Sequence, residues 1–95
     1  MFLGAYHFDG HPAQLLDAYR QLMQGYPPDN IDLHFCVERS DGITVYDACP
    51  SQEVFAAFST GPDFAGAVKA AGLPVPRVDQ LGEVRSARLR SGFGA

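Results

Sequence analysis

A chain of 95 residues has room for one domain, and its 46% hydrophobic and 19% charged residues are ordinary for a globular protein. Eleven acidic and seven basic residues give a net charge of −4, the wrong sign for a surface that holds the polyanionic backbone of nucleic acid. No apolar run approaches the roughly 18 residues that a membrane span needs. The two cysteines are isolated and the N-terminus does not resemble a secretion signal, so we expect a cytoplasmic protein.

The N-terminal third predicts a strand followed by a helix. Residues 2–8 are apolar at both odd and even positions, as in a central strand that is covered on both faces. Pro12 fits the first position of a helix, and Gly25 fits its end. The apolar residues between them recur at the spacing of one helical face: Leu15, Leu16, Tyr19, Leu22 and Met23.

From Ile31 the apolar period changes to two, which predicts a strand. We expect its apolar positions, Leu33 among them, to pack against helices, and His34 and Cys36 to lie on the opposite face of the sheet.

Residues 40–42 (SerAspGly) then predict a hairpin turn. A three-residue loop would set Val37 opposite Val45, whereas a two-residue loop of Asp41 and Gly42 would shift the pairing by one residue and exchange the two faces. We expect the three-residue loop, because it keeps Val45 on the apolar face of the preceding strand.

The second half of the chain predicts a broken helix and a last strand. Ser51 fits an N-cap, residues 59–62 (SerThrGlyPro) interrupt the helix, and Gly72 fits its C-terminal end. After an extended connector over 73–77, we expect a strand over 78–90 and a flexible tail over 91–95.

This order of elements predicts an α+β, ferredoxin-like βαββαβ domain over residues 1–90, with an antiparallel sheet of order 4-1-3-2 and the helices on one face. The other face is too apolar for solvent, so we expect a homodimer that closes sheet against sheet into an α/β barrel around a pocket. That face would carry the following residues: Leu3, Ala5, His7, His34, Cys36, Thr44, Tyr46 and Ala48.

Residues 42–76 carry a family resemblance. The segment AspGlyIleThrValTyrAspAlaCysProSerGlnGluValPheAlaAlaPhe, followed by ThrGlyProAspPhe and AlaAlaGlyLeuPro, resembles the dimeric α/β-barrel superfamily, closest to its antibiotic-biosynthesis-monooxygenase-like members. The resemblance implies a protein that binds a small hydrophobic or aromatic metabolite, with the chemistry of a cofactor-independent oxygenase, isomerase or cyclase. The alternative is a non-catalytic dimeric binding or regulatory module. Haem-degrading relatives use a tryptophan, which this chain lacks.

Three residues are candidates for catalysis in such a pocket. His7 and His34 are candidates for proton transfer and Tyr46 for orienting a substrate oxyanion. The candidate substrate-binding residues are Leu3, Ala5, Cys36 and Arg85. The arginine belongs to a basic C-terminal run that fits either a solvated edge strand or a docking site for an anion.

We expect no cofactor and no metal. His7, His34 and Asp47 are metal-ligand types, but in the predicted strand order a third strand separates the two histidines. Two other kinds of domain have the same order of helices and strands. An RNA-recognition domain is excluded because the third strand lacks basic residues, whereas an amino-acid-binding regulatory domain stays open through the turn at residues 9–12.

Overall fold

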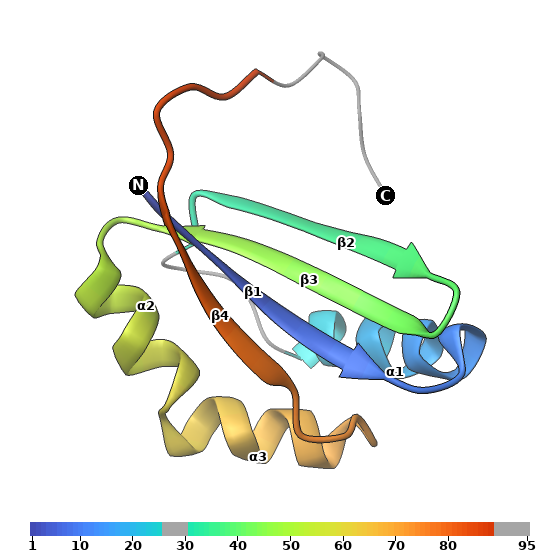
Figure 1. Cartoon of the computed structure of the whole chain (residues 1–95). Coiled ribbons are helices and arrows are strands. Elements are labelled where there is room, and N and C mark those ends of the chain that lie inside the picture. The colour runs from blue at the N-terminus through green and yellow to red at the C-terminus, as the bar shows by residue number, and fades with distance from the viewer. Residues whose placement is uncertain (26–30, 89–95) are drawn as a thin grey trace.

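The computed structural model describes residues 1–25 and 31–88. Its strands form one antiparallel sheet in the order β2-β3-β1-β4, which is the predicted ferredoxin-like order (Figure 1). The elements along the chain are β1 (Phe2–Asp9), α1 (Pro12–Gly25), β2 (Leu33–Arg39), β3 (Gly42–Cys49), α2 (Gln52–Ser59), α3 (Pro62–Ala70) and β4 (Arg77–Glu83).

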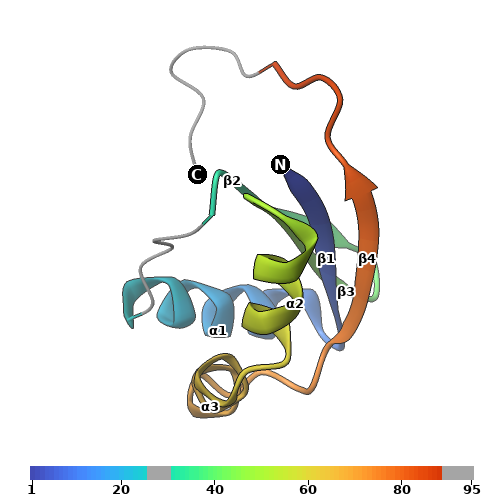
Figure 2. The same cartoon turned by 90° about the vertical axis from the view of Figure 1, so that its left-hand side faces the viewer.

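All the described helices cover the same face of this sheet (Figure 2). We call this the helix face and the other one the open face. The core lies under the helices, and its buried members include Phe2, Tyr6, Phe8, Ile43, Val45, Phe55, Phe64 and Val68. None of the described helices is long and apolar enough to cross a membrane.

The packing of α2 on the sheet depends on Gly4. The ring of Phe55 is fully buried and lies so close to β1 that a Cβ on Gly4 would be 2.0 Å from its Cζ atom. Neighbouring rings complete the contact, with Tyr6 5.5 Å and Phe2 6.0 Å from Phe55 between ring centroids. A glycine in the middle of this strand therefore makes the space that the aromatic core fills.

The predicted helix signals are confirmed. The Ser51 hydroxyl accepts a hydrogen bond from the amide of Val54, as an N-cap does. The helix stops at Ser59 and restarts at Pro62, because the proline ring suits the first position of a helix and not its interior. Gly72 follows α3 with φ of 84°, a conformation that glycine adopts without strain.

The predicted register of the hairpin is wrong. Arg39 pairs with Gly42, so the turn consists of Ser40 and Asp41, and Cys36 lies opposite Val45. Gly42 has no positive φ and is the first residue of β3, where a Cβ would be 2.1 Å from the carbonyl oxygen of Phe8. The glycine therefore allows close approach of two strands and does not form the loop.

This register reverses the expected faces of β2. Its apolar positions Leu33, Phe35 and Val37 lie on the open face, opposite Ala48, Tyr46 and Thr44. His34 and Cys36 lie on the helix face, so the expectation that they share the open face with His7 is wrong. Alternation along an edge strand cannot identify the covered face, because both faces of this sheet carry apolar side chains.

The last strand is shorter than predicted. It ends at Glu83, which pairs with Phe2 at the start of β1. The amide of Val84 still donates to the carbonyl of Met1, and residues 85–88, the last that the structure describes, lie outside the sheet. Arg85 is exposed and follows the strand. The tail predicted over 91–95 lies outside the described residues.

The Phe55–Gly4 contact generates a stability prediction. We expect Gly4→Ala to lower the free energy of unfolding by about 1–3 kcal/mol, because the added methyl group overpacks the aromatic core. Urea denaturation followed by circular dichroism measures the change.

Gly66→Ala is the matched control. Gly66 lies inside α3 with open space around the position of a Cβ. The same substitution there should raise stability by about 0.5–1 kcal/mol, since alanine is the better helix former. Equal effects at the two sites would contradict the packing argument.

Candidate functional site

On the helix face, His34 is held between two polar partners. It lies opposite Asp47 in the β2–β3 pairing, and its Nδ1 is 2.5 Å from Oδ1 of Asp47. The side chains of His34 and Asp47 are 20% and 5% exposed. Because a carboxylate only accepts hydrogen bonds, the proton of the neutral ring lies on Nδ1, which leaves Nε2 as an acceptor.

Tyr19 of α1 occupies that acceptor. Its hydroxyl oxygen is 2.5 Å from Nε2 of His34, and the two rings lie parallel with centroids 5.8 Å apart. Burial raises the pKa of Tyr19 to about 12, and the negative charges that Cys36 and Asp47 carry when ionised act in the same direction. Tyr19 therefore stays protonated and donates to His34, which completes a Tyr19–His34–Asp47 chain between helix and sheet.

This chain lies at the wall of an apolar cavity of about 30 Å³, which has room for a water molecule or two. Aromatic and aliphatic side chains from α1, the sheet, α2, α3 and the segment before β2 form the rest of the wall: Tyr6, Phe8, Leu22, Met23, Ile31, Val45, Phe58 and Phe64. The cavity thus lies beside this hydrogen-bonded chain, in apolar surroundings where hydrogen bonds and charges act strongly.

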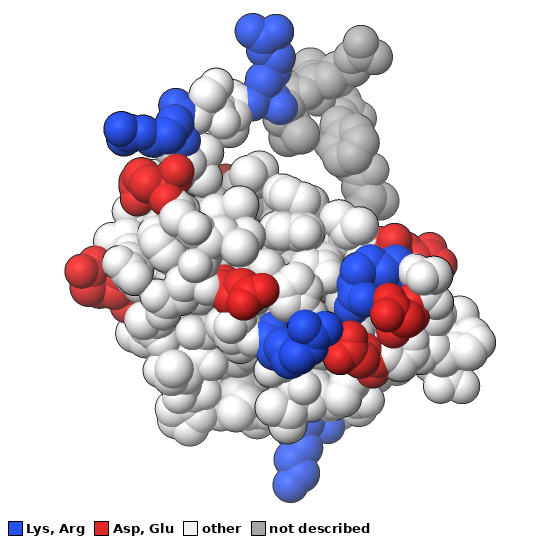
Figure 3. Space-filling model, in the orientation of Figure 1, with Lys and Arg blue, Asp and Glu red and all other residues white. Residues whose placement is uncertain are grey.

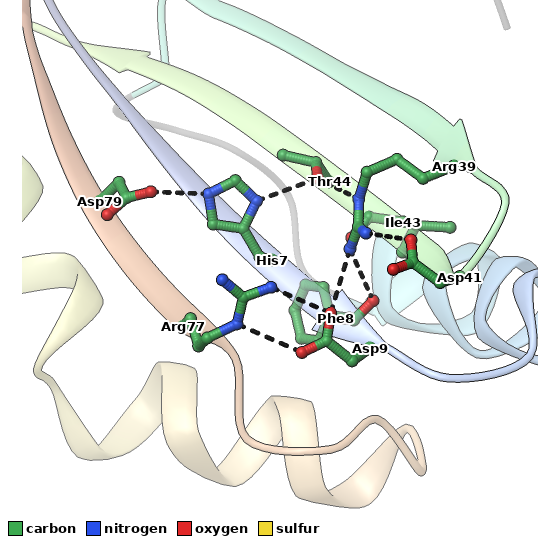
Figure 4. A network of polar contacts seen from close by, with 9 residues as sticks. All are labelled: His7, Phe8, Asp9, Arg39, Asp41, Ile43, Thr44, Arg77 and Asp79. Atoms are coloured by element: carbon green, nitrogen blue, oxygen red, sulfur yellow. Dashed lines mark hydrogen bonds and ion pairs between the residues drawn. The ribbon is translucent and has the colours of Figure 1, made fainter.

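On the open face, His7 forms a second hydrogen-bonded chain (Figure 4). Its Nε2 donates to Asp79 of β4 at 2.7 Å, and its Nδ1 accepts from the Thr44 hydroxyl at 3.0 Å. The Thr44 oxygen in turn accepts from Nε of Arg39 at 2.9 Å. Both ring nitrogens of His7 are therefore engaged.

Arg39 connects this chain to a group of ion pairs at the end of β1. It donates to Asp41 at 2.5 Å and to Asp9 at 3.3 Å, and Asp9 also receives two bonds from Arg77 (Figure 4). The two hydrogen bonds from Arg77, then the one from Arg39, hold the pKa of Asp9 below its usual value. Basic and acidic side chains accordingly form one band over the end of β1 and the β2–β3 turn, and the area directly above it is uncharged (Figure 3).

The structure thus separates the predicted site residues into three groups. His7, Tyr46, Leu3 and Ala5 lie on the open face, as the pairings of Ala5 with Tyr46 and of His7 with Thr44 require. His34 and Cys36 lie on the helix face, where burial raises the pKa of the Cys36 thiol. Arg85 belongs to neither hydrogen-bonded chain.

Two members of the His34 chain were not among the predicted site residues. Tyr19 was expected only to pack between helix and sheet, and Asp47 was considered only as a metal ligand. The sequence signal was present, since an aspartate within an apolar strand needs a buried partner. Finding that partner required the register of β2. Among residues 1–25 and 31–88, no cluster of three His, Cys, Asp or Glu side chains could hold a metal ion.

Comparisons with known proteins identify the fold. No protein-family model matches the chain, and no curated protein matches its sequence. The fold is similar to the crystal structure of a Deinococcus radiodurans protein described as a candidate antibiotic biosynthesis monooxygenase, with a TM-score of 0.63 and 10% sequence identity. The match covers 96% of this chain and 100% of that one. At this identity the similarity confirms the ferredoxin-like fold that the resemblance predicted, and nothing finer.

The Asp9 ion pairs generate a prediction on pH. Because the pKa of Asp9 is lower in the folded than in the unfolded chain, its carboxylate stabilises the fold above about pH 4, and this contribution is lost as the pH falls through the folded pKa. We therefore expect Asp9→Asn to be less stable than wild type at pH 7 and to approach it at pH 2.5 in urea denaturation.

Glu38→Gln is the control, because Glu38 is an exposed carboxylate of β2 that forms no ion pair with the described residues. A stability difference for Asp9→Asn that is the same at both pH values would contradict the assignment.

Proposed function

We propose that the protein is a homodimeric enzyme that binds a small hydrophobic or aromatic metabolite and uses His34 as its acid and base. The observation that carries the proposal is the position of His34, which lies between Asp47 and Tyr19 at the wall of an apolar cavity. A histidine with a polar partner on each ring nitrogen, beside an apolar hollow, is the kind of group that functional sites hold.

The chemistry follows from the two neighbours. Asp47 keeps the proton of the neutral ring on Nδ1 and stabilises the imidazolium that forms when Nε2 accepts a proton. A substrate hydroxyl that displaces the Tyr19 hydroxyl from Nε2 can pass its proton to His34 and become an oxyanion. Tyr19, which stays protonated, can then donate a hydrogen bond to that oxyanion.

This first step suits a cofactor-independent reaction. A substrate anion formed in this way can give electrons to dioxygen, as in cofactor-independent oxygenation, or can attack a carbonyl carbon of the same molecule, as in ring closure. Both begin with removal of a proton by a general base. The described similarity to a candidate monooxygenase agrees with this class.

The alternative is a non-catalytic dimeric binding or regulatory module. One observation favours this alternative. The cavity of about 30 Å³ is too small for a metabolite, because the protein's own side chains occupy most of the space around it. On this view the Tyr19–His34–Asp47 chain would stabilise the core and have no ligand.

The homodimer part of the proposal rests on the open face. Phe35 and Val37 are 39% and 41% exposed there, and the ring of Phe35 lies on Tyr46 with centroids 4.8 Å apart. Adjacent apolar side chains on an uncovered sheet are typical of an interface with a second sheet. In such a dimer His7, Tyr46, Leu3 and Ala5 would line the space between the two sheets.

The dimer is tested by a charge placed among the exposed apolar side chains of the open face. We expect wild type to sediment as a dimer and Phe35→Lys as a monomer, because the interface would have to bury an unpaired ammonium group. Val75→Lys is the control, since Val75 is 92% exposed in the connector before β4 and lies outside the interface. A monomeric wild type, or a dimeric Phe35→Lys variant, would refute this part.

The role of His34 is tested with 2-naphthol, an aromatic alcohol whose absorption spectrum changes on loss of its proton. We expect wild type to bind it with a spectrum shifted towards the naphtholate. His34→Gln should bind it roughly tenfold more weakly and with the neutral spectrum, as expected for loss of a charge-assisted hydrogen bond.

His11→Gln is the matched control, because His11 is an exposed histidine before α1. It should bind like wild type. Equal binding and equal spectra for His34→Gln and wild type would refute the acid–base role and favour the non-catalytic module.

A further inference from the structure

A second hollow lies on the helix side, between α3 and the connector that leads to β4. It is an open groove of about 620 Å³, within the range of sites that bind small molecules. Its lining is mainly apolar and consists of Ser59, Phe64, Ala65, Val68, Lys69, Leu73, Pro74, Val75, Pro76 and Val78.

Phe64 belongs to both hollows. Its ring lines the groove and also the cavity at His34. On the cavity side it lies 4.8 Å from the ring of Tyr6 and 5.2 Å from the ring of Phe58, between centroids. These rings are tilted by 40° and 44° to Phe64. One aromatic side chain therefore separates the large groove from the small cavity.

The two volumes are complementary. The cavity of about 30 Å³ is lined by the histidine but is too small for an aromatic ring, whereas the groove of about 620 Å³ has room for a ring system but is lined by no histidine or carboxylate. A ligand whose body lies in the groove could reach His34 with one polar group if the Phe64 ring turns aside. Rotamer changes of this kind are common in binding sites.

The groove also has a preferred charge. Lys69 is the charged member of its lining among the described residues, and no acidic side chain lines it. Lys69 lies in the last turn of α3 and is exposed. The groove therefore suits a negative group at the outer end of a ligand and disfavours a positive one, since an ammonium attracts anions at close range.

We propose that the groove and the His34 cavity form one binding site with Phe64 as the movable wall between them. The inference rests on the proposed function and names its substrate class: a flat apolar molecule with a hydroxyl group at the inner end and a carboxylate or similar anion at the outer end. The hydroxyl meets Nε2 of His34, the apolar body lies against Val68 and Leu73, and the anion lies near Lys69.

Three probes separate these contacts. 6-Hydroxy-2-naphthoate carries both polar groups, 2-naphthoate lacks the hydroxyl, and 2-naphthol lacks the carboxylate. Their affinities for wild type and variants are measured by fluorescence titration at pH 7. We expect wild type to bind 6-hydroxy-2-naphthoate most tightly.

Each variant removes one contact. Ala65→Trp fills the groove from an exposed position on α3, and it should weaken all three probes at least tenfold. Ala70→Trp is its control, because Ala70 is exposed on the same helix and does not line the groove. Lys69→Met should weaken the two carboxylates about two- to fivefold and leave 2-naphthol unchanged. His34→Gln should weaken the two hydroxyl probes and leave 2-naphthoate unchanged.

Failure of this inference differs from failure of the proposed function. If Ala65→Trp binds every probe like Ala70→Trp while His34→Gln still weakens 2-naphthol, the groove is not part of the site and the role of His34 stands. If Ala65→Trp weakens the probes and His34→Gln leaves all three unchanged, the groove binds ligands without His34, which overturns both proposals.

Discussion

The register of the β2–β3 hairpin decides what each face of the sheet contains. It is fixed where Arg39 pairs with Gly42, at a position so close to the carbonyl of Phe8 that a side chain on Gly42 has no room. From this pairing it follows that His34 lies opposite Asp47 under the helices and Phe35 opposite Tyr46 on the open face. A shift of one residue would exchange the two faces of β2 and separate His34 from its carboxylate.

A second constraint positions the helices that enclose the cavity. The close approach of Phe55 to Gly4 places α2 against β1, and the interruption between Ser59 and Pro62 turns the chain so that α3 runs separately along the same face. Phe64, in the first turns of α3, is thereby brought between the cavity and the groove. The break in the helix thus gives the protein two adjacent hollows with one aromatic wall.

The two histidines of the sheet differ in their hydrogen-bond partners and in the polarity of their surroundings. His34 has a buried carboxylate on one nitrogen and a tyrosine hydroxyl on the other, in apolar surroundings. His7 is part of a charged band in which its partner Asp79 is 58% exposed and Arg39 binds Thr44 from the other side. The first arrangement favours proton transfer to a ligand, whereas the second ties together β1, β3 and β4 at one end of the open face.

The sequence by itself determined the elements and their order. The cap at Ser51, the break before Pro62, the glycine after α3 and the spacing of apolar residues in α1 depend on contacts within a few residues, so they can be read from the chain. The strand order then follows because connections between elements are short and have a preferred handedness, and this order was predicted correctly.

Only the tertiary structure decided which face His34 occupies, that Tyr19 and Asp47 are its partners, and that β4 ends at Glu83. Each of these depends on residues far apart in the chain: the carbonyl of Phe8 against Gly42, a side chain of α1 against β2, and the start of β1 as the limit of pairing for β4. The alternation along β2 is the same whichever face is covered, because apolar side chains lie on both faces of this sheet. Close packing across the sheet removes that ambiguity, and such packing is not encoded in any local stretch of residues.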